Sequence, residues 1–227
     1  MKVEKTRVYG LEESLVASGY PMQADLFDNK IISAMQENEK VTDIVYRNAN
    51  DKDYKRARVL GTTKSGEGHD QYLTGIVVQF DLTFSLKAWT EMQRYHFIDF
   101  VSSQSTMHRI TQMNIDKCCN SYVSDEVKNN LKKLVDKYLE TKDKEDYLRV
   151  LYNMPTGLEL TARLTTNYRQ LKTIYKQRGQ HRLIEWREFC KWVETLPKFK
   201  ELVLGEWYER NNKRIFRITR FWRKKVY

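Results

Sequence analysis

The chain has 227 residues, of which 41% are apolar and 31% are charged, a composition that is typical of a globular protein and excludes the disordered and fibrous classes. The 40 Lys and Arg residues outnumber the 30 Asp and Glu residues, and the net charge of +10 favours anionic partners such as nucleotides, nucleic acid or acidic surfaces. No apolar run approaches the ~20 residues of a membrane-spanning helix, and the N-terminus lacks an apolar signal core, so we expect no membrane span and no secretory leader.

The cysteines and histidines indicate neither a disulfide framework nor a metal site. Cys118 and Cys119 are adjacent and Cys190 lies far away, which is neither the even, spaced set of a disulfide scaffold nor the spacing of a zinc site. The four histidines are too dispersed for a helix-borne metal pair. We therefore expect reduced thiols, a cytoplasmic location and no bound metal.

The first third of the chain predicts a short strand, two helices and a loop. Lys5–Tyr9 alternates as a strand, Leu11–Ala17 follows as a helix, and Asp25–Glu39 has the apolar spacing of a second helix. The polar, glycine-bearing stretch Asn48–His69 is typical of a hairpin or a mobile loop.

The middle of the chain carries the strongest strand pattern. Tyr72–Phe84 combines a β-branched run with apolar alternation and predicts a strand. Ser85 is a suitable N-cap for a helix from Leu86 to about Phe97, and a loop rich in small hydroxyl residues, 99–109, follows it.

The second half predicts mainly helices, one extended segment and a basic tail. Ser124 precedes an amphipathic helix whose apolar stripe runs from Val127 to Tyr138. The remaining expected segments are a helix at Lys144–Tyr152, an extended stretch at Leu158–Leu164, helices at Asn167–Lys176 and Leu183–Val193, and a tail at Lys213–Lys225 that alternates basic with aromatic or aliphatic residues.

Two segments contain residue types that could bind a ligand. The hydroxyls and amides of Ser102–Arg109 could hold a phosphate or a pyrimidine edge, although a solvated Ser-rich turn is the alternative. Arg178, at the end of a helix and beside His181, could bind an anion, although a basic solvated face is the alternative.

Together these segments resemble the flavin-dependent thymidylate synthases over about residues 75–195. The family elements N-x-R-x-L, L-R and H-x-x-x-E have counterparts here in Asn167, Arg169, Leu171, Arg178, His181 and Glu185. Arg149 precedes Met154–Pro155 much as a family arginine precedes a Leu-Pro pair.

The family signature R-H-R-x-x-S-x-N-x-x-S-x-R-Y is only partly present. If Ser105 is its second serine, His96 matches the signature histidine, whereas Tyr95 and Phe97 replace the flanking arginines. Arg94 and Arg109 lie one and two residues from arginines that are missing and are positioned to substitute for them. The other replacements are Ser102 for asparagine, Met107 for arginine and His108 for tyrosine.

The resemblance implies an α/β (α+β) fold in which helices flank a mostly antiparallel central sheet. It implies a single domain over residues 1–227, with a basic aromatic extension from about 205 to 227. It also implies transfer of a one-carbon unit from methylenetetrahydrofolate to C5 of dUMP, with FAD as cofactor, NADPH as reductant and a homotetramer that completes its sites between subunits. The protein supplies binding and electrostatics for this chemistry.

The resemblance also implies roles for individual residues. Arg149 would hold the nucleotide phosphate, and Arg178 would contact the pyrimidine carbonyl edge and act in catalysis. The other substrate contacts would be Ser103, Gln104, Ser105, Thr106 and Arg109. The flavin contacts would be Arg94, His96, Asn167, Arg169 and His181.

Two other functions stay open. Loss of the signature arginines suggests a related enzyme that makes another 5-substituted pyrimidine nucleotide, such as 5-hydroxymethyl-dUMP. The net charge and the aromatic tail suggest a nucleic-acid-binding protein, which we favour less because an amphipathic strand with a solvated basic face also explains that tail.

Overall fold

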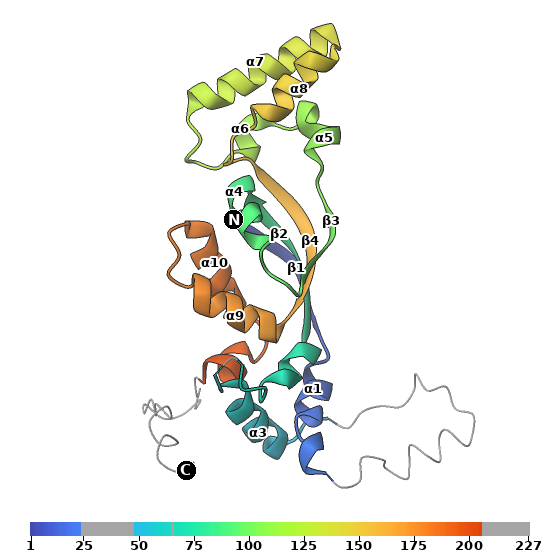
Figure 1. Ribbon diagram of the computed structural model, residues 1–227, viewed down its shortest axis with the longest axis vertical. Helices are drawn as coiled ribbons and strands as arrows, with labels where there is room; N and C mark the ends of the chain where they lie inside the picture. The colour runs from blue at the N-terminus through green and yellow to red at the C-terminus, as the bar shows by residue number, and fades with distance from the viewer. Residues whose placement is uncertain (24–47, 65, 206–227) are drawn as a thin grey trace, which may run out of the picture. The chain divides into compact units, whose positions relative to one another are not determined.

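The computed structural model describes residues 1–23, 48–64 and 66–205 (Figure 1). The described strands and helices are β1 (Lys2–Tyr9), α1 (Leu11–Ala17), α3 (Asp51–Gly61), β2 (Val77–Ser85), α4 (Leu86–Met92), β3 (Ile98–Ser103), α5 (Thr106–Arg109), α6 (Ile115–Cys118), α7 (Asp125–Thr141), α8 (Lys144–Tyr152), β4 (Glu159–Asn167), α9 (Tyr168–Arg178) and α10 (Ile184–Val193). The predicted helix at Asp25–Glu39 and the basic tail at Lys213–Lys225 lie outside the described residues.

The four described strands form one antiparallel sheet in the order β1-β2-β4-β3. This confirms the predicted mixture of helices with a mostly antiparallel sheet. β3 pairs with β4 from Ile98 opposite Thr166 to Ser103 opposite Ala162, and the register shifts between Phe100 and Ser102. The first half of the predicted Ser-rich loop is therefore wrong, because those residues extend the sheet as its edge strand.

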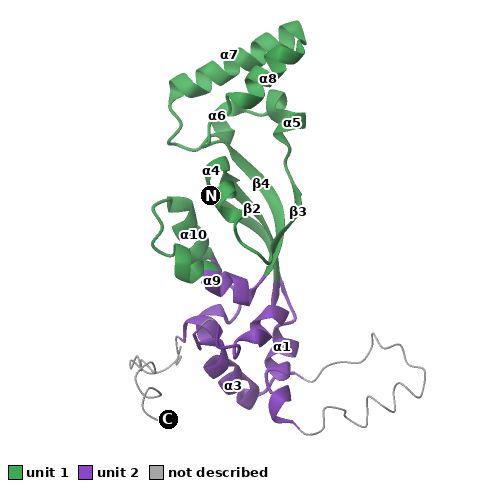
Figure 2. Ribbon diagram, viewed as in Figure 1, with its two compact units in different colours: residues 1–7, 78–166, 174–192 green, residues 8–77, 167–173, 193–227 purple. Residues whose placement is uncertain are grey.

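The described chain divides into two compact units, which Figure 2 shows in separate colours. Unit 1 comprises residues 1–7, 78–166 and 174–192, and unit 2 comprises residues 8–77, 167–173 and 193–227. Unit 1 contains most of the sheet together with α4–α8 and α10. Unit 2 contains α1, α3 and the first turns of α9.

The core of unit 1 lies between one sheet face and the helices that cover it. In β2, Phe80, Leu82 and Phe84 are buried, while the residues between them are half-buried on the opposite face. Phe84 packs edge-on against Trp186 of α10, with 5.3 Å between ring centres. The predicted alternation of β2 is confirmed. Edge-on ring contacts of this kind stabilise the packing of α10 against the apolar face of β2.

α7 and α8 build a second apolar cluster at one end of the sheet (Figure 2). Leu131 and Val135 on α7 pack with Val150 on α8 and Leu158 just before β4. The predicted helix 144–152 is confirmed at both ends. Asp143 caps it by accepting the N–H groups of Glu145 and Asp146.

Unit 2 contains a helix where the sequence predicts a hairpin or mobile loop. That prediction is wrong over Asp51–Gly61, which forms α3. Asn50 Oδ1 accepts the backbone N–H groups of Lys52 at 3.0 Å and Asp53 at 3.2 Å, and Asp53 Oδ2 accepts the N–H of Asn50 at 3.0 Å. This reciprocal capping starts the helix despite the polar composition of the segment.

Two other boundaries differ from the prediction. The predicted strand at Tyr72–Phe84 starts only at Val77, because Gln71–Gly75 forms a 3-10 turn in which Tyr72 Oη donates to the Ala57 carbonyl at 2.8 Å. The helix after Ser85 ends at Met92 rather than about Phe97, whose φ of 60° is incompatible with a continuing right-handed helix. Ser85 does cap that helix, since its hydroxyl accepts the N–H of Ala88 at 3.2 Å.

All three cysteines are free thiols in the structure. Cys119 and Cys190 are buried, and Cys118 is half-buried. Burial, followed by the neighbouring Cys119, raises the pKa of Cys118 to about 11. Over residues 1–23, 48–64 and 66–205, no helix is long and apolar enough to cross a membrane.

Candidate active site

Arg178 lies at the C-terminal end of α9, within a largely buried cluster of unit 1. Its Nε donates to Tyr95 Oη at 2.8 Å, and its Nη1 donates to Glu91 Oε2 at 2.9 Å. The guanidinium also lies over the Trp186 ring, 4.9 Å from the ring centre. With 15% of its side chain exposed, Arg178 does not belong to a solvated basic face. Nη2 is the one nitrogen of the guanidinium that has no hydrogen bond to a described residue, so it can meet a ligand oxygen.

Glu91, on α4, brings a compensating negative charge to Arg178. Its Oε2 also accepts from Trp186 Nε1 at 3.2 Å, and its Oε1 lies 3.3 Å from Lys87 Nζ. Burial alone would raise the pKa of Glu91. The hydrogen bond from Lys87 and the charges of His181 and Arg178 outweigh burial and hold this pKa below its ordinary value. Glu91 is therefore ionised at neutral pH and balances the charge of Arg178.

His181 joins this cluster through one edge of its ring. Its Nε2 lies 2.7 Å from Arg178 Nη1 and 3.4 Å from Glu91 Oε2, and its Nδ1 lies 3.2 Å from the backbone N–H of Leu183. A neutral imidazole carries one N–H, so only one ring nitrogen can accept a hydrogen bond. When the ring is neutral, Arg178 and Leu183 therefore compete for a single acceptor nitrogen, and the tautomer sets which of them donates to it.

Glu185, the counterpart of the glutamate in H-x-x-x-E, holds two helices together. Its side chain is buried at the start of α10. Both carboxylate oxygens accept hydrogen bonds from Ser85, from the backbone N–H and from the hydroxyl, each at 2.8 Å. Glu185 thus joins α10 to the beginning of α4, the two helices that carry Trp186 and Glu91 beside Arg178.

Most of the predicted substrate contacts lie near α5 and α8, away from the Arg178 cluster within unit 1 (Figure 2). Gln104 uses its backbone N–H and its side-chain oxygen to pair with Thr161, at 2.9 and 2.8 Å, which extends the pairing of β3 with β4. Tyr147 of α8 donates to the Met107 carbonyl of α5. Arg149 pairs with Asp146 at 2.8 Å and has 57% of its side chain exposed.

The remaining residues of this group are partly or fully exposed. Ser103 ends β3, Ser105 precedes α5, and Thr106 begins it. Arg109 donates to the Gln112 side chain at 2.6 Å. Among the described residues, no hydrogen bond or ion pair joins this group to Arg178 or His181, so one chain does not bring all the predicted substrate contacts together.

The predicted flavin contacts are likewise divided. Arg94 and His96 are exposed in the turn between α4 and β3, outside the Arg178 cluster. Asn167 and Arg169 belong to unit 2. Asn167 Oδ1 accepts the N–H of Gln170 at 2.9 Å and so caps α9, and Arg169 pairs with the buried Asp70 at 3.1 Å.

Sequence reasoning missed Glu91 and Trp186 as neighbours of Arg178. Tyr95 was visible only as the residue in place of a signature arginine. The periodicity of α4 placed Trp89 and Met92 on its buried face but gave no sign that Glu91 meets α9, because that contact depends on how the two helices pack. The one sequence signal for Glu91 was that it is a carboxylate among the apolar positions of the predicted helix.

Comparison with known proteins identifies the fold. No family model matches the chain, and no curated protein matches it by sequence. Among solved structures, a flavin-dependent thymidylate synthase, ThyX, from Helicobacter pylori complexed with FAD and dUMP has 17% sequence identity and a TM-score of 0.62, over 90% of this chain and 99% of that chain. A second structure of ThyX from Helicobacter pylori with FAD and dUMP has 16% identity and a TM-score of 0.65, over 90% of this chain and 98% of that chain.

The chain has the flavin-dependent thymidylate synthase fold. The alignment extends over nearly the whole length of both proteins, so the likeness concerns the complete arrangement of sheet and helices rather than one motif. Within this fold, the structure brings the side chains of two predicted site residues, Arg178 and His181, into direct contact.

Proposed function

We propose that the chain is a flavin-dependent enzyme that transfers a one-carbon unit from methylenetetrahydrofolate to C5 of dUMP and yields dTMP, with NADPH as the reductant. The observation that carries the proposal is the environment of Arg178. Its guanidinium is held at Nε and Nη1, stacked on Trp186, and open at Nη2. The fold of ThyX and the order of the motif residues along the chain support the same conclusion.

The residues around Arg178 fit an aromatic ligand that has an electron-rich edge. Tyr95 provides a half-buried ring, Arg178 provides a cation held in place over the buried Trp186 ring, and His181 provides a nitrogen whose proton position is adjustable. Both uracil and the flavin ring present carbonyl edges of this kind. FAD, when bound, supplies the electrons that convert the transferred carbon into a methyl group.

The role of Arg178 in this chemistry is electrostatic. Uracil C5 becomes nucleophilic as negative charge develops on the pyrimidine carbonyl oxygens. A guanidinium already fixed in place stabilises that charge without having to reorganise during the reaction. Glu91 and Tyr95 act as positioning residues, because they hold the guanidinium rather than the substrate. His96, Arg94, Asn167 and Arg169 are proposed to contribute to flavin binding, and Arg149 with Ser103–Thr106 and Arg109 to hold the nucleotide.

The replacement of a signature arginine by Tyr95 favours one alternative product. Tyr95 Oη donates to Gln177 at 2.9 Å while it accepts from Arg178, so a neutral hydroxyl now occupies the neighbourhood of the catalytic cation. A site altered in this way would let water add to the transferred one-carbon unit in place of its reduction to methyl, with 5-hydroxymethyl-dUMP as the product and tetrahydrofolate released.

Flavin titration and product analysis test the proposal. The purified chain should quench the fluorescence of added FAD saturably. With dUMP, methylenetetrahydrofolate and NADPH it should then give a product whose mass identifies dTMP or 5-hydroxymethyl-dUMP. Lys133→Gln is a suitable control, because Lys133 is exposed on α7 and away from these residues. Absence of FAD binding at every accessible concentration would refute the cofactor assignment.

A further inference from the structure

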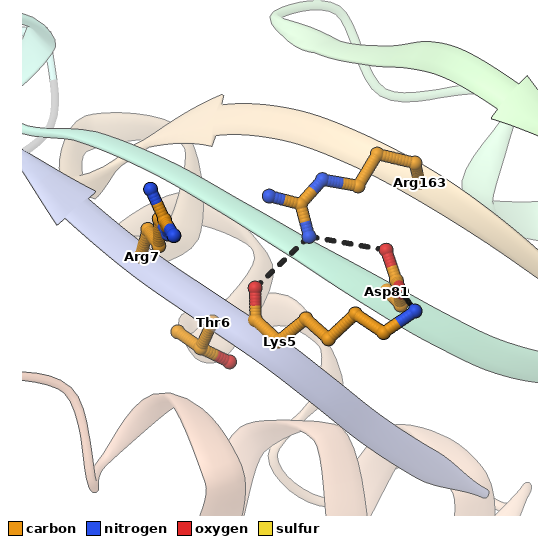
Figure 3. Close-up of a pocket in the computed structure, with 5 residues that line it drawn as sticks. All are labelled: Lys5, Thr6, Arg7, Asp81 and Arg163. Carbon is orange, nitrogen blue, oxygen red and sulfur yellow. Dashed lines mark hydrogen bonds and ion pairs between the residues drawn. The ribbon is translucent and has the colours of Figure 1, made fainter.

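A second group of charged residues lines a hollow on the polar face of the sheet in unit 1 (Figure 3). The hollow has a volume of about 520 Å³ and is lined by Lys5, Thr6 and Arg7 of β1, Asp81 of β2 and Arg163 of β4. We call these five residues the strand pocket. Asp81 and Arg163 lie on the sheet face opposite the apolar core, because their neighbours along each strand are buried.

The strand alternation of β1 is interrupted at this point. Lys5 has a φ of 48°, in the left-handed region that residues other than glycine rarely adopt. Its carbonyl accepts a hydrogen bond from Arg163 Nη1 at 2.9 Å. Because the backbone turns at Lys5, three consecutive residues of β1 can line one hollow.

Arg163 is held at one end of its guanidinium. Nη1 donates to Asp81 Oδ1 at 3.1 Å as well as to the Lys5 carbonyl, and the other terminal nitrogen points along the sheet toward Arg7 in Figure 3. Over the described residues, every side-chain hydrogen bond of Arg163 comes from Nη1. The pocket therefore contains a pre-oriented guanidinium that keeps donors available.

The charge of the strand pocket is unbalanced. Lys5 Nζ lies 3.1 Å from Asp81 Oδ2, so the one carboxylate of the pocket already faces two cations. Burial alone would raise the pKa of Asp81, but the hydrogen bonds from Arg163 and Lys5 outweigh it and keep this pKa below its ordinary value. Arg7 is exposed, and its side chain makes no hydrogen bond or ion pair with the described part of the chain. Three cations thus face one anion.

We propose that the strand pocket binds the phosphate group of a small phosphorylated molecule, as a phosphate monoester or a diphosphate. Two guanidinium groups with free N–H donors match the oxygens of a phosphate, and a dianion would balance the net charge of the pocket. The volume lies within the about 300–1,000 Å³ of small-molecule sites. All five lining residues are polar, so the pocket would recognise the phosphate rather than an attached ring.

Calorimetric titration of the full chain with inorganic pyrophosphate at low salt tests this site. We expect saturable binding that Arg7→Gln weakens about tenfold or more, the effect of losing a charge-assisted hydrogen bond. Arg7→Lys should restore only part of the affinity, because an ammonium group lacks the planar fork. Since Arg7 has no partner among the described residues, these variants should melt like the wild-type chain.

Two matched variants and one competing ligand make the result decisive. Lys133→Gln removes the same charge from an exposed site on α7 and should leave pyrophosphate binding within about twofold of wild type. Arg149→Gln, which tests the nucleotide contact of the proposed function, should also retain this binding.

The proposal is overturned if wild type does not bind saturably, if Arg7→Gln binds like Lys133→Gln, or if Arg149→Gln alone abolishes binding. It is equally overturned if a single-stranded oligonucleotide binds through Arg7 far more tightly and with a steep salt dependence, because that result identifies a nucleic-acid surface.

Discussion

At the scale of single residues, Arg178 combines two roles that its substitutions can separate. It holds Glu91, Tyr95 and His181 together, and it is the proposed contact to the pyrimidine. Removing it leaves the half-buried Glu91 carboxylate without its nearest cation. Arg178→Ala should therefore destabilise the fold by about 1.5–3 kcal/mol and lower turnover by about 10²-fold or more.

Arg178→Lys distinguishes these roles. A lysine can still meet Glu91, so much of the lost stability should return, whereas turnover should stay low because a point charge does not reproduce the planar donor pair. Thermal melts and single-turnover rates on the three proteins measure both effects. Equal recovery of stability and turnover in the lysine variant would assign Arg178 a purely structural role.

Asp70 and Lys172 form a buried ion pair in unit 2, and no pattern in the sequence indicated that Lys172 would be buried. Their charged atoms are 2.5 Å apart, and each side chain is 1% exposed. Burial alone would raise the pKa of Asp70, but the hydrogen bond and charge of Lys172 and the charge of Arg169 outweigh it and lower this pKa. The pair's contribution is thus complete above the unfolded pKa of about 3.9 and is lost as pH falls through the lower folded value.

Asp70→Asn should therefore destabilise the chain by about 3–5 kcal/mol at neutral pH, because it leaves the Lys172 ammonium buried without a counter-charge. The difference from wild type should begin to shrink below about pH 4, because Asp70 of the unfolded wild-type chain is protonated there, and it should go on shrinking as pH falls toward the lower pKa of the folded state. Urea unfolding between pH 3 and 7 measures this difference. The double variant Asp70→Asn, Lys172→Met should recover part of the loss. A difference that does not change with pH would mean that the Asp70 charge is not responsible.

At the scale of elements, the sequence was most informative where large apolar residues repeat. The alternation of β2 and the stripe of α7 predicted both elements, and the ends of α1 and α8 were correct. α3 was missed because its buried positions are Asp53, Ala57 and Gly61, which give no apolar periodicity. A Cβ at Gly61 would collide with the Leu202 carbonyl, so a residue that looks like a loop glycine is required for close packing.

The same limit applied to the candidate site. Arg178 and His181 could be paired from their spacing on one chain segment. Glu91 and the strand pocket could not be found in this way, because both depend on how distant elements pack. The register of β1, β2 and β4 brings together Lys5, Asp81 and Arg163, and no local pattern encodes that register.

The capping of α3 gives a prediction at this scale. Asn50→Ala removes the side-chain acceptor for two backbone N–H groups and should lower the free energy of unfolding by about 0.5–2 kcal/mol. Asn50→Asp should be nearly neutral, since a carboxylate accepts the same bonds. Lys55→Ala is the control, because Lys55 is exposed in the middle of the helix. Chemical denaturation followed by circular dichroism measures all three, and an unchanged Asn50→Ala would show that packing alone holds α3.

At the scale of the whole molecule, we predict a homotetramer, because the predicted site residues of one chain are divided between separate groups. The edge strand β3 adds a physical reason. Phe100 and Val101 are 43% and 59% exposed on an edge strand that has unpaired backbone groups. An exposed apolar edge of this kind is usually covered by another element or another chain. Light scattering at micromolar concentration should give the mass of four chains.

Val101→Lys should shift this assembly toward smaller species without lowering thermal stability within one chain, because Val101 is largely exposed. Lys133→Gln again serves as the control. A wild-type protein that is monomeric throughout this concentration range would exclude sites completed by a second subunit.

The state of the cysteines has a practical consequence for studying this protein. Cys119 and Cys190 are buried, and the pKa of Cys118 is raised to about 11, so at neutral pH Cys118 carries almost no thiolate, which is the form that reacts with maleimides. A single cysteine introduced at an exposed position, such as Val59 in unit 2 or Tyr122 in unit 1, would then be the principal site of labelling. Pairs of spin labels at such positions would measure the distances between the two units in solution without first replacing any native thiol.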